Sequence, residues 1–149
     1  MKARHLARLL RSLLLVGASG MLIAGCAPPP RQRAVVEVAC DEVMGVPPPV
    51  RINRQVDLDA GAVLALRLCR TAGSGFVWED PRVGDAAVVS STGRAFETPS
   101  TVRPGAAGLE VLTFEARGSG ATSIVLDYSQ PWQGGQKGVW RVTVDVRVS

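Results

Sequence analysis

The stretch GVWRVTVDVRV, Gly138–Val148, decides the fold class of this 149-residue chain. Between residues 140 and 148 every even-numbered residue is apolar and every odd-numbered residue is polar. An alternation with a period of two is typical of a β-strand that has one face on a core and the other in water. We therefore predict that the chain closes with an amphipathic strand.

Working back from that strand, several further runs have the composition and alternation of strands. Leu109–Ala116 and Ala121–Tyr128 alternate in the same way, and Ala62–Leu68 is apolar enough for a central strand. Shorter candidates are Val35–Ala39, Gln55–Leu58, Phe76–Trp78 and Ala87–Ser90. Gly- and Pro-containing turns separate the runs, and no window after residue 34 has a helical period. We predict an all-β fold, an immunoglobulin-like β-sandwich formed by residues 35–149.

The N-terminal segment, residues 1–25, has the features of a bacterial lipoprotein signal peptide. A basic start is followed by the apolar stretch Leu13–Ala24, which is too short for a comfortable membrane span. It ends in Ile23-Ala24-Gly25-Cys26, the apolar-small-small-Cys pattern at which lipoprotein precursors are cut before the cysteine is acylated. We expect lipidation at Cys26 and a Pro-rich tether over residues 26–34. The alternative is an ordinary signal peptide with a chance cysteine.

Removal of residues 1–25 changes what the composition implies. The leader holds four basic residues and no acidic one, so the formal charge falls from +4 to zero and the electrostatic case for nucleic-acid binding disappears. The only histidine, His5, is lost as well. Without an imidazole the mature chain cannot use Ser-His or Cys-His catalysis or a His-ligated metal. We expect no metal and no cofactor.

Cys40 and Cys69 are the two cysteines that remain once Cys26 is lipidated. Two thiols in an oxidising compartment suggest one disulfide, and the alternative is two buried, unpaired thiols. We expect a monomer in the bacterial cell envelope, facing the periplasm. Ala27 follows the lipidated cysteine in place of the Asp that retains many lipoproteins at the inner membrane, which favours the outer membrane.

Three connections rich in Gly and small residues are the candidates for function: residues 71–75, 104–108 and 130–135. If consecutive strands run alternately up and down, these connections share one end of the sandwich. Three adaptable loops at one rim are a common way for such a scaffold to present a binding surface.

Motifs in these loops resemble those of the chagasin-type cysteine-peptidase inhibitors. Thr71–Trp78 is similar to that family's Asn-Pro-Thr-Thr-Gly-aromatic-x-Trp signature, and Gly105–Gly108 looks like its Gly-rich second loop. Tyr128–Gly134 resembles its third motif, usually Arg-Pro-Trp followed by an acidic residue and Gly. The order and the spacing agree, and the resemblance covers most of residues 55–149.

The resemblance implies reversible inhibition of papain-type cysteine peptidases by three loops that enter the active-site cleft. Such an inhibitor needs a rigid scaffold and an aromatic anchor rather than an acid, a base or a metal. Phe76 and Trp78 would belong to the strand and core, and Trp132 would be the main anchor; its alternative role is a rim aromatic packed on its own loops. The implied peptidase contacts are Thr71, Ala72, Gly73, Ser74, Gly75, Gly105, Ala106, Ala107, Gly108, Gln130, Pro131 and Trp132.

The motifs also depart from the family pattern. Thr71-Ala72 stands in place of Asn-Pro, Gly73 in place of the first Thr, and Gln130 in place of Arg. Loss of the proline ring and gain of a glycine raise the entropy lost on docking, by up to about 1 kcal/mol each.

Two other classes of function compete with inhibition. One is a non-inhibitory envelope lipoprotein that binds another protein through the same loop rim. The other is an enzyme that uses carboxylates in pairs, drawn from Glu79, Asp80, Glu110 and Asp127. No spacing marks these carboxylates as catalytic, so an enzyme is the weakest hypothesis.

Overall fold

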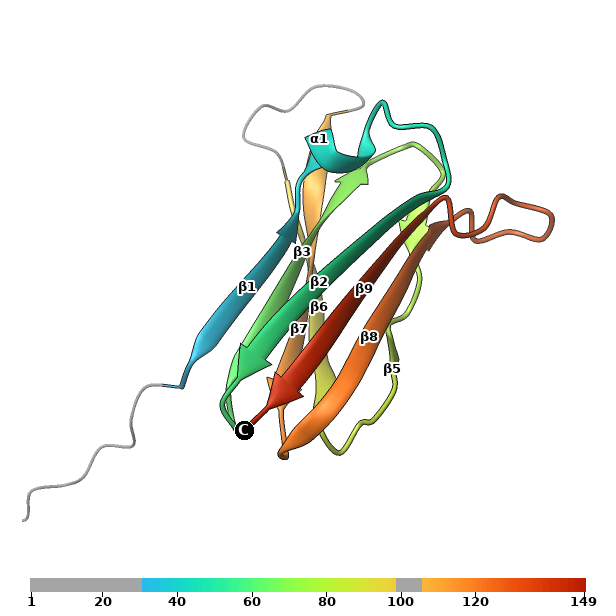
Figure 1. Ribbon diagram of the computed structural model, residues 1–149. Coiled ribbons are helices and arrows are strands. Elements are labelled where there is room, and N and C mark those ends of the chain that lie inside the picture. Colours follow the sequence, from blue (N-terminus) through green and yellow to red (C-terminus); the bar gives the residue numbers. More distant parts are fainter. Residues whose placement is uncertain (1–30, 99–105) are drawn as a thin grey trace, which may run out of the picture.

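The computed structural model describes residues 31–98 and 106–149. Two sheets face each other (Figure 1), and apart from one short helix all regular structure there is β-strand. The elements are β1 (Arg33–Val38), α1 (Cys40–Val43), β2 (Val50–Leu58), β3 (Val63–Thr71), β4 (Val77–Trp78), β5 (Arg82–Val83), β6 (Val89–Glu97), β7 (Ala107–Ala116), β8 (Gly120–Ser129) and β9 (Trp140–Val148). The all-β sandwich is confirmed.

The strand order follows from the pairing. One sheet has the order β1-β3-β7-β6, and the other has the order β2-β9-β8-β4 with β5 paired to β8. Two pairs are parallel, β1 with β3 and β2 with β9, and the remaining pairs are antiparallel. β3 lies between β1 and β7, as expected for the most uniformly apolar run.

The core lies between the two sheets and is formed by alternate residues of each strand. In β9 the even-numbered residues from Val142 to Val148 are at most 3% exposed, which confirms the alternation of the closing strand. Leu112 and Phe114 of β7 face Ile124 and Leu126 of β8 across the same interior. Burying these side chains removes apolar surface from water at roughly 25 cal/mol per Å².

Several predicted strand bounds were wrong at the edges of the sheets. β2 begins at Val50, five residues before the predicted start, and β6 runs to Glu97 rather than ending at Ser90. β4 has only two residues, so Phe76 lies outside it, and the single turn of α1 was not predicted. From Ser91 on, β6 is exposed on both faces, so it lacks the alternation by which a half-buried strand is recognised.

Cys40 and Cys69 form a disulfide, with their Cα atoms 4.9 Å apart, so the predicted pairing is confirmed. The bond ties α1 to β3 two residues before that strand ends. Cross-linking residues 29 positions apart stabilises a fold by about 3–4 kcal/mol in the chain-entropy view. Within the described residues no helix is long and apolar enough to span a membrane, and no group of three His, Cys, Asp or Glu is placed to hold a metal ion.

Candidate functional site

The strand register brings the three connections to one end of the sandwich. We name them loop 1 (residues 72–76), loop 2 (residues 98–106) and loop 3 (residues 130–139). Thr71 at the end of β3 pairs with Ala107 at the start of β7, which joins loop 1 to loop 2. Val77 after loop 1 pairs with Ser129 before loop 3. Loops 1 and 3 and the described ends of loop 2 therefore lie at one end of the sandwich, as predicted (Figure 1). Residues 99–105 of loop 2, Gly105 among them, lie outside the described residues.

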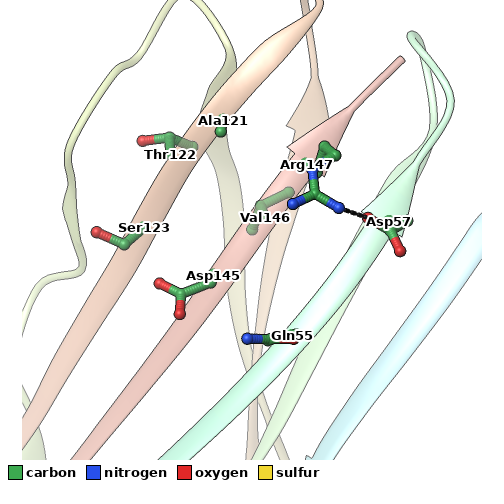
Figure 2. Close-up of a pocket in the computed structure, with 8 residues that line it drawn as sticks. All are labelled: Gln55, Asp57, Ala121, Thr122, Ser123, Asp145, Val146 and Arg147. Atoms are coloured by element: carbon green, nitrogen blue, oxygen red, sulfur yellow. Dashed lines mark hydrogen bonds and ion pairs between the residues drawn. The ribbon is translucent and has the colours of Figure 1, made fainter.

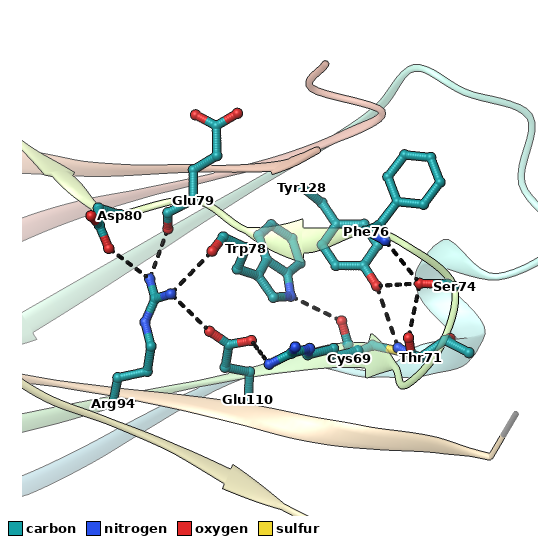
Figure 3. A network of polar contacts seen from close by, with 11 residues as sticks. Cys69, Thr71, Ser74, Phe76, Trp78, Glu79, Asp80, Arg94, Glu110 and Tyr128 are labelled. Carbon is teal, nitrogen blue, oxygen red and sulfur yellow. Dashed lines mark hydrogen bonds and ion pairs between the residues drawn. The ribbon is translucent and has the colours of Figure 1, made fainter. Parts of the chain in front are cut away.

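Loop 1 is braced by hydrogen bonds that involve one serine and one tyrosine (Figure 3). The Ser74 hydroxyl donates to the carbonyl oxygen of Thr71 at 2.8 Å, and the Phe76 amide donates to the Ser74 hydroxyl at 3.2 Å. The Tyr128 hydroxyl lies 3.3 Å from the Ser74 hydroxyl and accepts from the Thr71 amide at 3.4 Å. Ser74, predicted as a peptidase contact, thus also stabilises the conformation of the loop.

Gly75 is the point at which loop 1 meets loop 3. Its φ is +81°, a conformation that favours glycine, and a Cβ there would lie 2.9 Å from the Cη2 atom of Trp132. The Trp132 ring therefore rests on the Gly75 backbone. Gly73 has a similar φ of +79°, but a Cβ there would meet no described atom within 4 Å. The final glycine of the motif serves both backbone conformation and ring packing.

The position of Trp132 is compatible with both roles considered for it. One part of its ring packs on loop 1, and the side chain is still 50% exposed. A large aromatic that is held in place and half exposed is a suitable anchor for a partner protein, because little side-chain freedom remains to be lost on binding. Its neighbour Pro131 is exposed as well.

Loop 3 holds its shape through its own hydrogen bonds. The Gln130 amide donates to the carbonyl oxygen of Gln136 at 2.8 Å, and the Gln136 amide donates back to Gln130 Oε1 at 2.9 Å. The Gly135 amide donates to the Trp132 carbonyl at 3.2 Å. A Cβ at Gly135 would lie 2.7 Å from Gln130 Cβ and 3.0 Å from Trp132 Nε1. Gln130, which stands where the related motif has Arg, closes this turn.

On the side of loop 2 that the structure describes, Gly108 is packed tightly against the neighbouring strand. Ala106 and Ala107 are half-buried, and Gly108 is buried as the second residue of β7. A Cβ at Gly108 would lie 2.6 Å from both Phe96 Cζ and the Glu97 carbonyl oxygen. Close packing of the Phe96 ring against the backbone therefore requires a glycine at this position.

An aromatic cluster supports the loops from below. Tyr128 stacks on Trp140 with ring centroids 4.4 Å apart, and it packs against Trp78 at 5.0 Å and Phe76 at 5.6 Å. Trp78 is 1% exposed, and its indole N–H donates to the Cys69 carbonyl at 3.0 Å. The prediction that Phe76 and Trp78 anchor the core rather than the surface is confirmed for Trp78, while Phe76 is half-buried at its edge.

Sequence reasoning overlooked the contribution of Tyr128 and Trp140 to this cluster. The alternation marks Tyr128 only as a residue on one face of its strand, yet its hydroxyl is what reaches loop 1. A polar tip on a buried aromatic usually finds a hydrogen-bond partner, and this was the available signal. The alternation alone does not show which loop that partner occupies.

The buried carboxylate Glu110 is paired rather than free. It is 1% exposed and lies 3.0 Å from Arg70 Nη1 and 3.3 Å from Arg94 Nη1. Arg94 also donates to the carbonyl oxygens of Trp78 and Glu79, so it bridges the two sheets (Figure 3). A buried ion pair of this kind is weak evidence for stability, because the cost of removing both charges from water offsets their attraction.

Asp127 in β8 is held by two arginines. Arg141 donates to both of its carboxylate oxygens, at 2.6 and 2.8 Å, and Arg82 donates at 2.7 Å. The hydrogen bonds from Arg141, and after them the one from Arg82, lower the pKa of Asp127 to about 2 from an ordinary 3.8. A general acid near neutral pH needs a raised pKa, so Asp127 is unsuited to that role.

One hollow of the molecule lies far from the loops. Figure 2 shows it on the outer face of β2, β8 and β9, beside the start of β8 and the end of β9. Polar side chains make up most of its lining, and Asp57 and Arg147 form an exposed ion pair there at 3.5 Å. The shape is that of a shallow depression in a sheet rather than a catalytic cleft.

Comparison with known proteins decides the family. The model of the chagasin family of peptidase inhibitors (I42) matches residues 57–146, more than half of the chain and all three loops. The chain belongs to the chagasin family. Members of this family are inhibitors of peptidases rather than enzymes, which agrees with the paired state of Glu110 and Asp127.

Solved structures share the chagasin fold with this chain. The cysteine protease inhibitor EhICP2 from Entamoeba histolytica has 14% identity and a TM-score of 0.58, over 78% of this chain and 97% of that one. PbICP-C, determined in complex with falcipain-2, has 14% identity and a TM-score of 0.61, over 78% and 99%. Amebosin has 16% identity and a TM-score of 0.51, over 78% and 98%. A comparison with curated protein sequences gives no match.

Proposed function

We propose that this chagasin-family chain is a reversible inhibitor of papain-type cysteine peptidases and that its three loops enter the active-site cleft. Family membership supports inhibition of a peptidase, and the similar inhibitor PbICP-C was determined in complex with falcipain-2. The observation that carries the proposal is the seat of Trp132 on Gly75. It makes loops 1 and 3 one continuous rim with a half-exposed aromatic at its tip.

The rim is suited to entering a cleft because hydrogen bonds fix the shape of its loops before binding. Ser74 and Tyr128 brace loop 1 without the proline of the related motif, and loop 3 carries its own hydrogen bonds. Each immobilised rotamer-rich side chain costs about 0.5–1.5 kcal/mol on binding, so prior bracing preserves affinity. The inhibitor itself needs to supply no reacting group.

The test is an inhibition assay with the full chain in detergent against several papain-type peptidases. We expect inhibition below micromolar concentration, and Trp132→Ala should weaken it by at least about 30-fold, because a buried hot-spot aromatic contributes about 2 kcal/mol or more. Val35→Ala is the matched control, since Val35 is 57% exposed on β1, away from the loops. Absence of inhibition across the panel, with capture of a partner that has no catalytic cysteine, would instead establish a non-inhibitory binding module.

We propose in addition that the chain is anchored in the bacterial envelope by lipid on Cys26 and faces the periplasm. The sequence Ile23–Cys26 supports this, and so does the disulfide between the other two cysteines, because such bonds persist in oxidising compartments. Cys26→Ser should accumulate as the uncut precursor. Ala27→Asp should move the mature chain from the outer to the inner membrane fraction, and mature wild-type chain already in the inner membrane would contradict the outer-membrane assignment.

A further inference from the structure

The chain enters the domain at a well-fixed point. The Val63 amide donates to the Gln32 carbonyl at 2.9 Å, and the Asp59 amide donates to Gln32 Oε1 at 2.8 Å. Arg31 also lies 3.6 Å from Glu115. These contacts attach residues 31 and 32 to the β2–β3 turn and to the end of β7. We call this end of the sandwich the base.

The base lies at the opposite end of the sandwich from loops 1 and 3 and from the described ends of loop 2. β1 runs parallel to β3 from the pair Arg33–Val63, and β3 ends at Thr71 beside loop 1. Nine residues of extended strand span about 27 Å. Ser149 is also at the base, since its carbonyl accepts from the Ala60 amide, as Figure 1 shows for the C-terminus.

We propose that the position of the base opposite the loops determines which peptidases the inhibitor can reach. A chain anchored at Cys26 holds its loops away from the membrane, where they can bind a peptidase in the aqueous phase. This inference rests on the proposed inhibitor function and on the lipid anchor. From Cys26 to Arg33 the chain spans at most about 25 Å. A peptidase domain of about 220 residues has a radius of gyration of about 17 Å, hence a width of roughly 40 Å.

The span of the tether and the width of the peptidase together determine whether a peptidase can reach the loops. A peptidase of that width does not fit between the bilayer and a rim held within the reach of the tether, so loops that faced the membrane would be blocked. Loops at the far end stand clear by the length of the sandwich as well as the tether. The competing orientation has a physical basis, because Trp132, Met44 and Val46 are exposed near the rim and amphipathic aromatics favour a lipid interface.

The first test compares one protein in two settings. The lipidated full chain is inserted from outside into preformed vesicles, and its inhibition of soluble papain is compared with that of the same chain in detergent. We expect inhibition constants within about threefold of each other. The matched variant carries a twelve-residue Gly-Ser insert after Pro30 and should behave identically. A loss of 30-fold or more on vesicles that the insert relieves would overturn the proposed orientation.

The second test does not require inhibition. Trp132 fluorescence, taken as the difference between wild type and Trp132→Phe, is measured in vesicles that carry a lipid-borne quencher. We expect the difference signal to match that of quencher-free vesicles, and quenching of most of it would overturn the inference. If the chain inhibits no peptidase in detergent and its Trp132 signal is not quenched, the inhibitor function is refuted but the proposed orientation of the loops is supported. A chain that lacks lipid and stays in the aqueous phase overturns the inference itself.

Discussion

Loop 1 ends at β4 and loop 3 begins at β8, the strand paired with β4, but the two loops hold their shapes in different ways. Loop 1 depends on a side chain from outside itself, since the Tyr128 hydroxyl reaches both Thr71 and Ser74 from the aromatic cluster. Loop 3 is closed by its own residues through the paired contacts of Gln130 and Gln136. A loop can therefore be made rigid in two ways. Loop 1, which lacks the proline of the related motif, is held by a side chain of the core, and loop 3 is held by hydrogen bonds within its own turn.

The largest effect is expected from a substitution at the contact between loop 1 and loop 3. Gly75→Ala adds a Cβ 2.9 Å from the Trp132 ring at a φ of +81°, so it strains the backbone and displaces the anchor together. We expect inhibition to weaken by roughly 30–100-fold, a loss of about 2–3 kcal/mol. The measurement is the inhibition constant against papain.

Gly73→Ala is the matched control, because it imposes a similar φ of +79° on alanine with no described atom near the new methyl group. It should lose less than about 10-fold. Equal losses in the two variants would show that backbone strain alone, and not the seat of Trp132, accounts for the effect.

Acid tests the contribution of Asp127, which lies in β8 just before loop 3. Asp127 precedes that loop by three residues, and its pKa is about 2, below the ordinary 3.8. A lowered pKa contributes stability that is present above about pH 4 and is lost as pH falls through about 2, here at most about 2 kcal/mol because both arginine partners are about half exposed. Urea unfolding of wild type and Asp127→Asn should differ at pH 7 and converge near pH 2. A gap that persists at pH 2 would contradict this assignment.

Removing one hydroxyl tests the external brace of loop 1. Tyr128→Phe keeps the ring stack on Trp140 and deletes the contacts to Thr71 and Ser74. We expect inhibition to weaken about 5–10-fold, with about 1 kcal/mol lost from folding stability. Ser74→Ala should cost a similar amount, and the double variant should cost less than the sum, because both changes remove the same bond. Strict additivity would mean that the two hydroxyls act separately.

The smallest effect tests the internal closure of loop 3. Gln130→Ala deletes the acceptor for the Gln136 amide, at a cost of about 0.5–1 kcal/mol or a two- to fivefold weaker inhibition constant. Gln133→Ala, at an exposed position of the same loop, is the control and should change little. If Gln133 proves the more sensitive position, direct contact with the peptidase outweighs loop closure.

Much of the fold could be predicted from the sequence because the inner strands alternate strictly. β9 and β7 carry one buried face each, and that pattern is visible residue by residue. The pattern fails in β6, which is exposed beyond Ser90. The first half of β2 does alternate, with Val50 and Ile52 buried, but it directly follows three prolines and was not predicted. Parallel pairing of β1 with β3 was also hidden, since alternation is the same in parallel and antiparallel strands.

The site was predictable as a set of loops but not as a set of contacts. The motifs placed Trp132 and Gly75 in neighbouring loops. The packing of the Trp132 ring on Gly75, however, depends on the register between β4 and β8, two strands that lie far apart in the sequence. Gly108 shows the same limit, because the Phe96 ring that requires this glycine lies in the half of β6 that was not predicted. A glycine in a motif indicates a close approach or an unusual φ, and only the neighbours distinguish the two.

The disulfide beneath loop 1 has a consequence for how inhibition is to be measured. Papain-type peptidases are active only with a free thiolate, so their assay buffers contain a reductant, whereas this chain keeps Cys40 and Cys69 oxidised. Cys69 has no exposed surface, so exchange with a reductant proceeds at partly exposed Cys40 or after local opening of α1. Inhibition that decays with preincubation time in dithiothreitol would report the slow release of α1 rather than weak binding. The same protein would then show two apparent potencies that depend only on the order in which reductant, peptidase and inhibitor are mixed.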